Sequence, residues 1–163
     1  EIMVRVREGR WLMEHDPGSS FRCGPYALEH IFAFSQPGVG PNRQLAQARS
    51  TTQGTSLLQM RDLARQAGLD LRMAHRSGNA TIPLPAMVHW KSGHFAALLE
   101  SSGDLYRAED ATFDGSFWVS RDALKDEASG YFLVPGTELP AGCESHRERR
   151  RPDSLNQATV AWA

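Results

Sequence analysis

The sequence predicts an α+β domain in which helices come first and an antiparallel sheet follows. Between residues 21 and 68, apolar residues recur every three or four positions, which is typical of helices that bury one face. After Gly68 the apolar period changes to two, which indicates strands. Short turns rich in glycine and serine join these strands, and such short links favour antiparallel neighbours. Helices segregated against an antiparallel sheet define the α+β class.

Three helices are predicted in the first half of the chain. Pro25 fits the first turn of the first helix, where its missing N–H costs nothing. The third helix has a good N-cap in Thr55 or Ser56, and Gly68 is a typical residue just past its end. The predicted helices cover residues 21–34, residues 43–49 and the segment from Thr55 or Ser56 to Gly68.

Six strands are predicted in the second half, because short apolar runs alternate with turn residues. Ser120 is a suitable cap for one helical turn between the last two strands. The predicted strands are residues 69–74, 85–90, 94–99, 105–109, 117–119 and 131–134, and the helical turn is residues 120–127.

Three segments are expected along the chain. Residues 1–17 are predicted to be an N-terminal extension that packs on the domain, with a short strand or helix over residues 2–13. Residues 18–137 are predicted to form the domain itself. Residues 138–163 are rich in Pro, Gly, Glu and Arg, so we interpret them as a tail or linker. Their arginine run lacks interleaved aromatic residues, which favours a solvated segment over a nucleic-acid patch.

Composition and charge agree with one modest globular domain. The chain has 163 residues, 40% of them hydrophobic and 23% charged, and its formal net charge is -1. Because 18 basic residues nearly balance 19 acidic ones, no net basic footprint for nucleic acid is present. No run reaches the roughly 20 apolar residues of a membrane span. The chain begins at Glu1 without a signal stretch, so we expect a processed or excised piece.

The chain has two cysteines, Cys23 and Cys143. Two are too few for a disulfide-dense scaffold or for a four-thiolate zinc site. Cys143 falls in the predicted tail, so a bridge between the two is not expected. Cys23 therefore needs an explanation of its own.

Cys23 lies where a turn becomes a helix. Unpaired N–H groups and the positive end of the helix dipole favour a thiolate there, and they can bind a substrate oxyanion. Its neighbours are Arg22 and Gly24, and Gly24 has no side chain to block approach. A core thiol would more often sit mid-helix among apolar residues. Cys23 is thus a candidate nucleophile, with a buried core cysteine as the alternative.

A cysteine nucleophile needs a base, usually a histidine oriented by a third group. His30 is two helical turns, about 10 Å, beyond Cys23, which is too far for direct proton transfer. His89 and His94 lie on adjacent predicted strands, and His94 begins an apolar strand directly after a glycine. A histidine at the head of an apolar strand is expected to lie at the edge of a cleft. The residues alone leave His94 open between a general base and an ordinary, partly buried histidine.

Two acids, Glu109 and Asp110, end the next predicted strand. Successive side chains of a strand point to opposite faces, so only one of them can face His94. The alternative for both is a solvated turn acid. A metal site is a further alternative, in which Cys23, His94 and Asp110 would need His15 as a fourth ligand. We disfavour it and expect no cofactor.

An ordered set of motifs over residues 18–135 resembles the double-glycine leader peptidases, the bacteriocin-processing cysteine peptidases of the papain-like superfamily. The motifs are Cys23-Gly24-Pro25 with Ala27-Leu28, Gln44-Leu45-Ala46, Gly54-Thr55-Ser56, Pro85–Trp90, Gly93-His94-Phe95, Asp110-Ala111-Thr112 with Gly115, and Gly130–Leu133. The resemblance implies a papain-like fold and a Cys-His-Asp triad. It makes Cys23 the nucleophile, His94 the general base and acid, and Asp110 the residue that orients His94, with His89 as a structural neighbour.

The chain departs from the family pattern at two positions. The family has a glutamine six residues before the cysteine, where it helps to form the oxyanion hole, and here that residue is Pro17. We expect the Cys23 amide with Ser19 or Ser20 to substitute, beside the open approach at Gly24. Losing one oxyanion donor costs on the order of 10²–10³ in rate. The second departure is the residue after Asp110, an alanine where the family usually has proline.

The expected function is that of a cysteine peptidase acting on a peptide or protein. The resemblance implies cleavage after small residues or Gly-Gly. It also allows self-processing of a parent polypeptide, since relatives occur inside large bacterial exported, toxin-like proteins. The sequence leaves the location open between the bacterial cytoplasm and export as part of a larger protein. Two alternatives remain: a catalytically impaired peptide-binding module of the same fold, favoured by the missing glutamine, and an acyl transferase or deamidase with the same triad.

Overall fold

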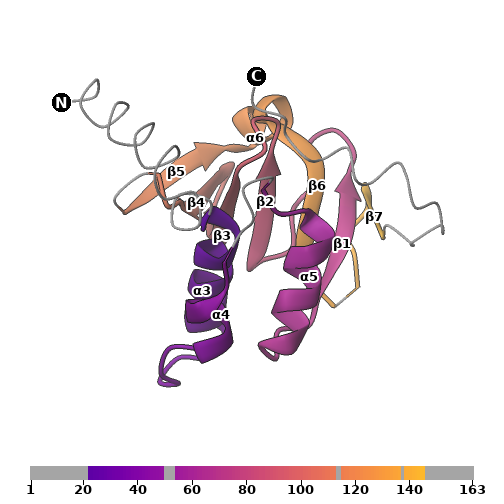
Figure 1. Ribbon diagram of the computed structural model, residues 1–163. Helices are drawn as coiled ribbons and strands as arrows, with labels where there is room; N and C mark the ends of the chain where they lie inside the picture. The colour runs from indigo at the N-terminus through magenta and orange to yellow at the C-terminus, as the bar shows by residue number, and fades with distance from the viewer. Residues whose placement is uncertain (1–21, 50–53, 113–114, 137, 146–163) are drawn as a thin grey trace.

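The computed structural model describes residues 22–49, 54–112, 115–136 and 138–145. The expected N-terminal extension and the end of the expected tail lie outside the described residues. In the described part, helices come first and lie against one face of an antiparallel sheet (Figure 1). The predicted α+β class, a helical lobe packed on a C-terminal antiparallel sheet, is confirmed. The helices of this lobe are α3 (Cys23–Ser35), α4 (Arg43–Gln47) and α5 (Leu57–Gln66).

Within the described residues, the sheet has seven strands in the order β5-β4-β3-β2-β6-β1-β7. All the pairs are antiparallel, as the short turns indicate. The last long strand, β6, lies between the first two, and a seven-residue helix, α6, leads into it. The bounds are β1 (Leu71–Arg76), β2 (Ala86–Trp90), β3 (Phe95–Ser102), β4 (Leu105–Glu109), β5 (Ser116–Ser120), α6 (Arg121–Glu127), β6 (Ala128–Pro135) and β7 (Cys143–Ser145).

Each face of the sheet buries its own apolar cluster. One cluster joins the sheet to α3 and α5 and contains Leu28, Met60 and Leu133. The other lies on the opposite face and contains Phe132 and Tyr106. Successive residues of a strand point to opposite faces, so Phe132 and Leu133 of β6 belong to different clusters. The sheet is therefore anchored on both sides, and α3 is fixed against its middle.

Local signals in the sequence set where the helices begin. Ser56 caps α5 in a reciprocal box with Gln59, which decides between the two predicted caps. Asn42 caps α4. The N-cap of α3 is Arg22, whose side chain makes no capping hydrogen bond, and Cys23 is the first helical residue. The helix that carries the candidate nucleophile thus has no side-chain cap at its start.

The last short strand, β7, differs from the expectation of a tail after residue 137. Cys143 pairs with Arg76 of β1, and Ser77 donates its N–H to the carbonyl of Gly142 at 2.8 Å. Three residues carry no alternation that could reveal a strand in the sequence. The strand forms because the edge of β1 offers unpaired backbone groups. Residues 143–145, which fall within the expected tail, thus form a strand that pairs with β1.

Candidate active site

The three candidate residues lie at the ends of three packed elements. Cys23 begins α3, His94 immediately precedes β3, and Asp110 immediately follows β4. Since β3 and β4 are antiparallel partners, the start of one and the end of the other meet at the same end of the sheet. Helix α3 packs on β3. The topology thus brings together residues that are up to 87 positions apart, from 23 to 110.

His94 and Asp110 form a close pair. Nε2 of His94 lies 2.6 Å from Oδ1 of Asp110, and the two side chains are 27% and 3% exposed. Glu109 is engaged elsewhere, because its Oε1 accepts a hydrogen bond from Arg107 at 2.7 Å. Of the two acids at the end of this strand, Asp110 is therefore the one that faces His94.

The electrostatics favour a charged pair. Burial lowers the pKa of His94, but hydrogen bonds to Asp110 and Cys23 outweigh burial and raise the pKa to about 9. For Asp110, burial raises the pKa, but hydrogen bonds from His94 and Thr112 outweigh this and lower it. An imidazolium facing a carboxylate is the favoured state at neutral pH.

A hydrogen bond to Cys23 is among the causes that raise the pKa of His94, so the two side chains are close together. The imidazole uses Nε2 toward Asp110, so Nδ1 is the ring nitrogen left for the Cys23 sulfur. The Cys23 thiol is free and partly buried, and it packs against the cluster between α3 and the sheet. It sits at the start of a 13-residue helix, where backbone N–H groups lack intrahelical partners. Cys143 is also free, so the two cysteines form no disulfide.

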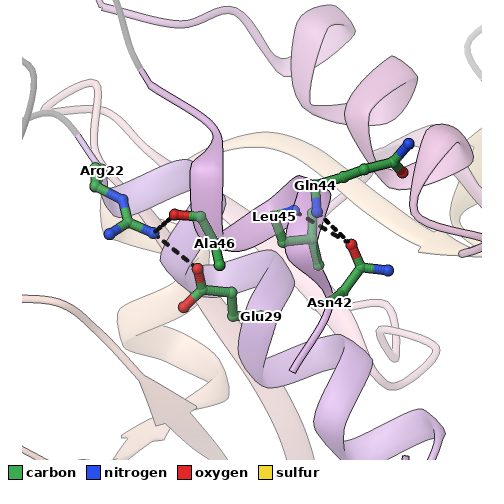
Figure 2. A network of polar contacts seen from close by, with 6 residues as sticks. All are labelled: Arg22, Glu29, Asn42, Gln44, Leu45 and Ala46. Carbon is green, nitrogen blue, oxygen red and sulfur yellow. Dashed lines mark hydrogen bonds and ion pairs between the residues drawn. The ribbon is translucent and has the colours of Figure 1, made fainter. Parts of the chain in front are cut away.

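Arg22 ties the start of α3 to α4, a contact that the sequence analysis missed. Its Nη2 donates to Oε1 of Glu29 at 2.8 Å and to the carbonyl of Ala46 at 3.1 Å (Figure 2). Glu29 is two turns further along α3, and Ala46 is in α4. The only signal in the sequence is the spacing of Arg22 and Glu29, and it does not reveal the contact with Ala46.

Thr112 is a second residue that the sequence analysis did not single out as functional. Its backbone N–H donates to Oδ1 of Asp110 at 2.8 Å, and its hydroxyl oxygen lies 3.3 Å from Nε2 of His94. A backbone N–H two residues after an aspartate is a frequent partner of that side chain in turns. Thr112 therefore contacts both members of the pair.

Gly24 is buried against α5. A Cβ at this position would overlap the sulfur of Met60, so a side chain here would force the Met60 side chain to move. This packing replaces the open approach that the sequence analysis inferred from the missing side chain. The other expected oxyanion residues, Ser19 and Ser20, lie outside the described residues, as does Pro17.

The contacts of His89 are with residues other than His94 and Asp110. Its Nδ1 lies 2.9 Å from the hydroxyl of Ser129, its ring packs on Phe95, and burial lowers its pKa. It is a buried neighbour on β2, as the resemblance implies. Among the residues that the structure describes, no group of three or more His, Cys, Asp or Glu side chains is placed to hold a metal ion.

The structure thus has a cysteine at the start of a helix and a His-Asp pair at one end of two inner strands of the sheet on which that helix packs. The sequence model of the peptidase C39 family matches residues 18–138. This match covers most of the chain, so the chain belongs to the peptidase C39 family. The expected resemblance to the double-glycine peptidases is confirmed.

Two solved structures support the same fold. A double glycine motif protease from an AMS/PCAT transporter, in complex with the leader peptide, is 21% identical with a TM-score of 0.57. The likeness covers 69% of this chain and 81% of that chain. The N-terminal peptidase C39 like domain of the toxin secretion ATP-binding protein from Vibrio parahaemolyticus is 12% identical with a TM-score of 0.55, over 68% of this chain and 93% of that chain.

No curated protein matches the chain. Within the described ranges, no helix has the length and apolar character needed to cross a bilayer.

Proposed function

We propose that this chain hydrolyses peptide bonds with Cys23 as nucleophile, His94 as general base and acid, and Asp110 as the group that orients His94. One observation supports the proposal: the imidazole of His94 lies 2.6 Å from the buried carboxylate of Asp110 and also interacts with the thiol of Cys23. Nucleophile, base and orienting group in this order are the requirements of covalent acyl transfer.

The first half of the reaction forms a thioester. In the starting state the thiol proton has already moved to Nδ1 of His94, and the Cys23 sulfur attacks the carbonyl carbon of the scissile bond as a thiolate. The tetrahedral intermediate collapses as the C–N bond breaks, and the leaving amine takes the proton back from His94. Asp110 stabilises the imidazolium during both transfers.

The second half releases the acyl group. His94 accepts a proton from water, whose oxygen attacks the thioester carbonyl. The C–S bond then breaks, and the Cys23 thiolate and the imidazolium of His94 are restored while the peptide leaves with a new carboxyl end.

The oxyanion would be held at the start of α3. The backbone N–H of Cys23 and the positive end of the helix dipole favour negative charge there. Ser19 or Ser20 is our candidate for the second donor, in place of the glutamine that the family pattern has at Pro17.

For the substrate we propose a leader peptide with small residues, Gly-Gly in particular, before the cleavage site. Family membership supports this, as does a similar structure that was solved with a leader peptide. The chain itself contains no Gly-Gly pair, so self-processing would need a site elsewhere in a parent polypeptide.

A peptide with an internal Gly-Gly pair tests this proposal, with a matched peptide that carries Val-Val instead. Mass spectrometry of the products should show cleavage after Gly-Gly, little cleavage after Val-Val, and none with the Cys23→Ala variant. Binding of the Gly-Gly peptide by the wild-type chain without any cleavage would instead support the peptide-binding module that the sequence left open. Cleavage that persists in Cys23→Ala would exclude the proposed mechanism.

A further inference from the structure

The carboxylate of Asp110 is almost completely buried. Its side chain is 3% exposed, whereas that of its partner His94 is 27% exposed. An ionised carboxylate removed from water needs hydrogen-bond donors in the protein. His94 is one donor, at 2.6 Å. A second donor is required to hold the carboxylate in a fixed orientation, because a single contact leaves it free to rotate about that contact.

Thr112 can supply the second hydrogen-bond donor to Asp110 through its backbone N–H and its hydroxyl. Its backbone N–H donates to Oδ1 of Asp110 at 2.8 Å, the same oxygen that faces His94. Its hydroxyl oxygen lies 3.3 Å from Nε2 of His94, and a hydrogen bond from its side chain is among the causes that lower the pKa of Asp110. Thr112 thus contacts both side chains of the pair, at Oδ1 of Asp110 and at Nε2 of His94.

We infer that Thr112 is a positioning residue: its hydroxyl and backbone N–H together hold Oδ1 of Asp110 on Nε2 of His94 and so keep Nδ1 of His94 toward Cys23. This inference rests on the proposed function, because positioning matters only if the three residues act together. Thr112 does not touch the bond that is cleaved.

The physical consequence is a more stable imidazolium. Donors to Asp110 favour its ionised form, and an ionised Asp110 favours the protonated form of His94. The groups that face His94 directly are Cys23 and Asp110. Two further titratable groups lie on the strands packed beside it, His89 on β2 and Glu109 at the end of β4. Removing the Thr112 hydroxyl leaves all four of these side chains in place. A change in the titration of His94 therefore reports on the loss of the hydroxyl.

The test is an NMR titration of the histidine ring signals in the complete chain, combined with the pH profile of peptide cleavage. Thr112→Val keeps the shape and the backbone N–H but loses the hydroxyl. Thr112→Ser keeps both donors. Thr81→Val makes the same chemical change at an exposed threonine between β1 and β2 and is the matched control.

In Thr112→Val we expect the His94 titration and the upper limb of the kcat/KM profile to move down by about 0.5–1 pH unit. Near pH 10, on the falling limb, kcat/KM should fall about 3- to 10-fold with little change in KM, whereas at pH 8 the fall should be less than about 2-fold. Thr112→Ser and Thr81→Val should follow the wild type. Thr112→Ala, which lacks the hydroxyl without adding a branched apolar side chain, should behave as Thr112→Val and guards against a folding defect in that variant.

Two results would overturn the inference. One is an unchanged His94 titration in both Thr112→Val and Thr112→Ala. The other is an equal loss of activity in Thr112→Ser, which would show that the hydroxyl is irrelevant. Failure of the proposed function looks different, since in that case His94→Ala would leave cleavage and Cys23 reactivity unchanged.

Discussion

Nε2 of His94 lies 2.6 Å from Oδ1 of Asp110, and this contact determines which ring nitrogen is left for Cys23. The pair joins the start of β3 to the end of β4, so its geometry depends on the register of two antiparallel strands. The relationship is testable in several independent ways.

Thiol reactivity should distinguish the two cysteines. Cys23 has His94 beside it as a base, whereas burial raises the pKa of Cys143, whose S–H donates to the carbonyl of Thr81 at 3.4 Å. With iodoacetamide at pH 7, Cys23 should react at least tenfold faster than Cys143, as measured by mass spectrometry of each cysteine. His94→Ala should slow Cys23 and leave Cys143 unchanged. Equal, slow labelling of both thiols would contradict the assignment of Cys23 as nucleophile.

Removing the charge of Asp110 should reduce activity through His94. We expect Asp110→Ala to lower kcat/KM by about 10²–10⁴-fold, since the imidazole loses both its orientation and its counter-charge. Asp110→Asn should be milder, because its amide oxygen still accepts from Nε2. Glu109→Gln is the matched control, since Glu109 is engaged by Arg107. A loss in Glu109→Gln as large as in Asp110→Ala would show that the wrong acid has been assigned.

The stability of the domain should depend on pH in alkaline solution. The pKa of His94 is raised from its ordinary value of 6.5 to about 9, so its contribution is complete below about pH 6.5 and is lost as the pH rises through 9. The contribution is on the order of 3 kcal/mol. The pKa of Asp110 is lowered, so its contribution is present above about pH 4 and is lost in acid. In urea unfolding between pH 5 and 10, the free energies of unfolding of the wild type and of His94→Ala should become equal at high pH. A constant difference across this range would contradict the pKa of His94.

Gly24 should be intolerant of a side chain because of Met60. The Cβ of Gly24→Ala would overlap the Met60 sulfur, which is buried against α3, and should lower the free energy of unfolding by about 1–3 kcal/mol. In a double-mutant cycle, Gly24→Ala with Met60→Ala should cost less than the sum of the single changes. Strict additivity would show that the two residues do not compete for the same space.

The contact of Arg22 with Glu29 and Ala46 should hold the start of α3. Because the Arg22 and Glu29 side chains are about one third exposed, the ion pair itself should contribute no more than about 1 kcal/mol. Arg22→Met should therefore change the melting temperature only slightly, yet reduce cleavage a few-fold through the backbone at Cys23. Glu29→Gln, which keeps a hydrogen-bond acceptor for Arg22, is the comparison. An Arg22→Met enzyme with normal kcat would show that the contact has no effect on the nucleophile.

The sequence predicted those parts of the fold that depend on local signals. The switch of period after Gly68 located the change from helices to strands, and Ser56 was one of two predicted caps for α5. The place of β6 between β1 and β2 could not be predicted, because it depends on which apolar faces fit together after the chain has folded. The strand at Cys143 was missed because three residues show no alternation.

The site was only partly predictable. The residues alone left both the choice between Glu109 and Asp110 and the role of His94 open, and the resemblance to a family selected among them. Thr112 contacts the pair through its backbone N–H and its hydroxyl, and Arg22 contacts Glu29 and Ala46 through its long side chain. Such contacts depend on distances between segments that are far apart in sequence or held in a turn, and no spacing rule reveals them.

The most direct test of the central claim is to trap the acyl group on the protein. A peptide ester that ends in Gly-Gly is mixed with the chain, the reaction is quenched in acid, and the intact and digested masses are measured. We expect a mass increase equal to the acyl part, located on the peptide that contains Cys23, at a level strongly reduced in His94→Ala. Turnover of the ester without any adduct on Cys23, or an adduct on another residue, would contradict the account.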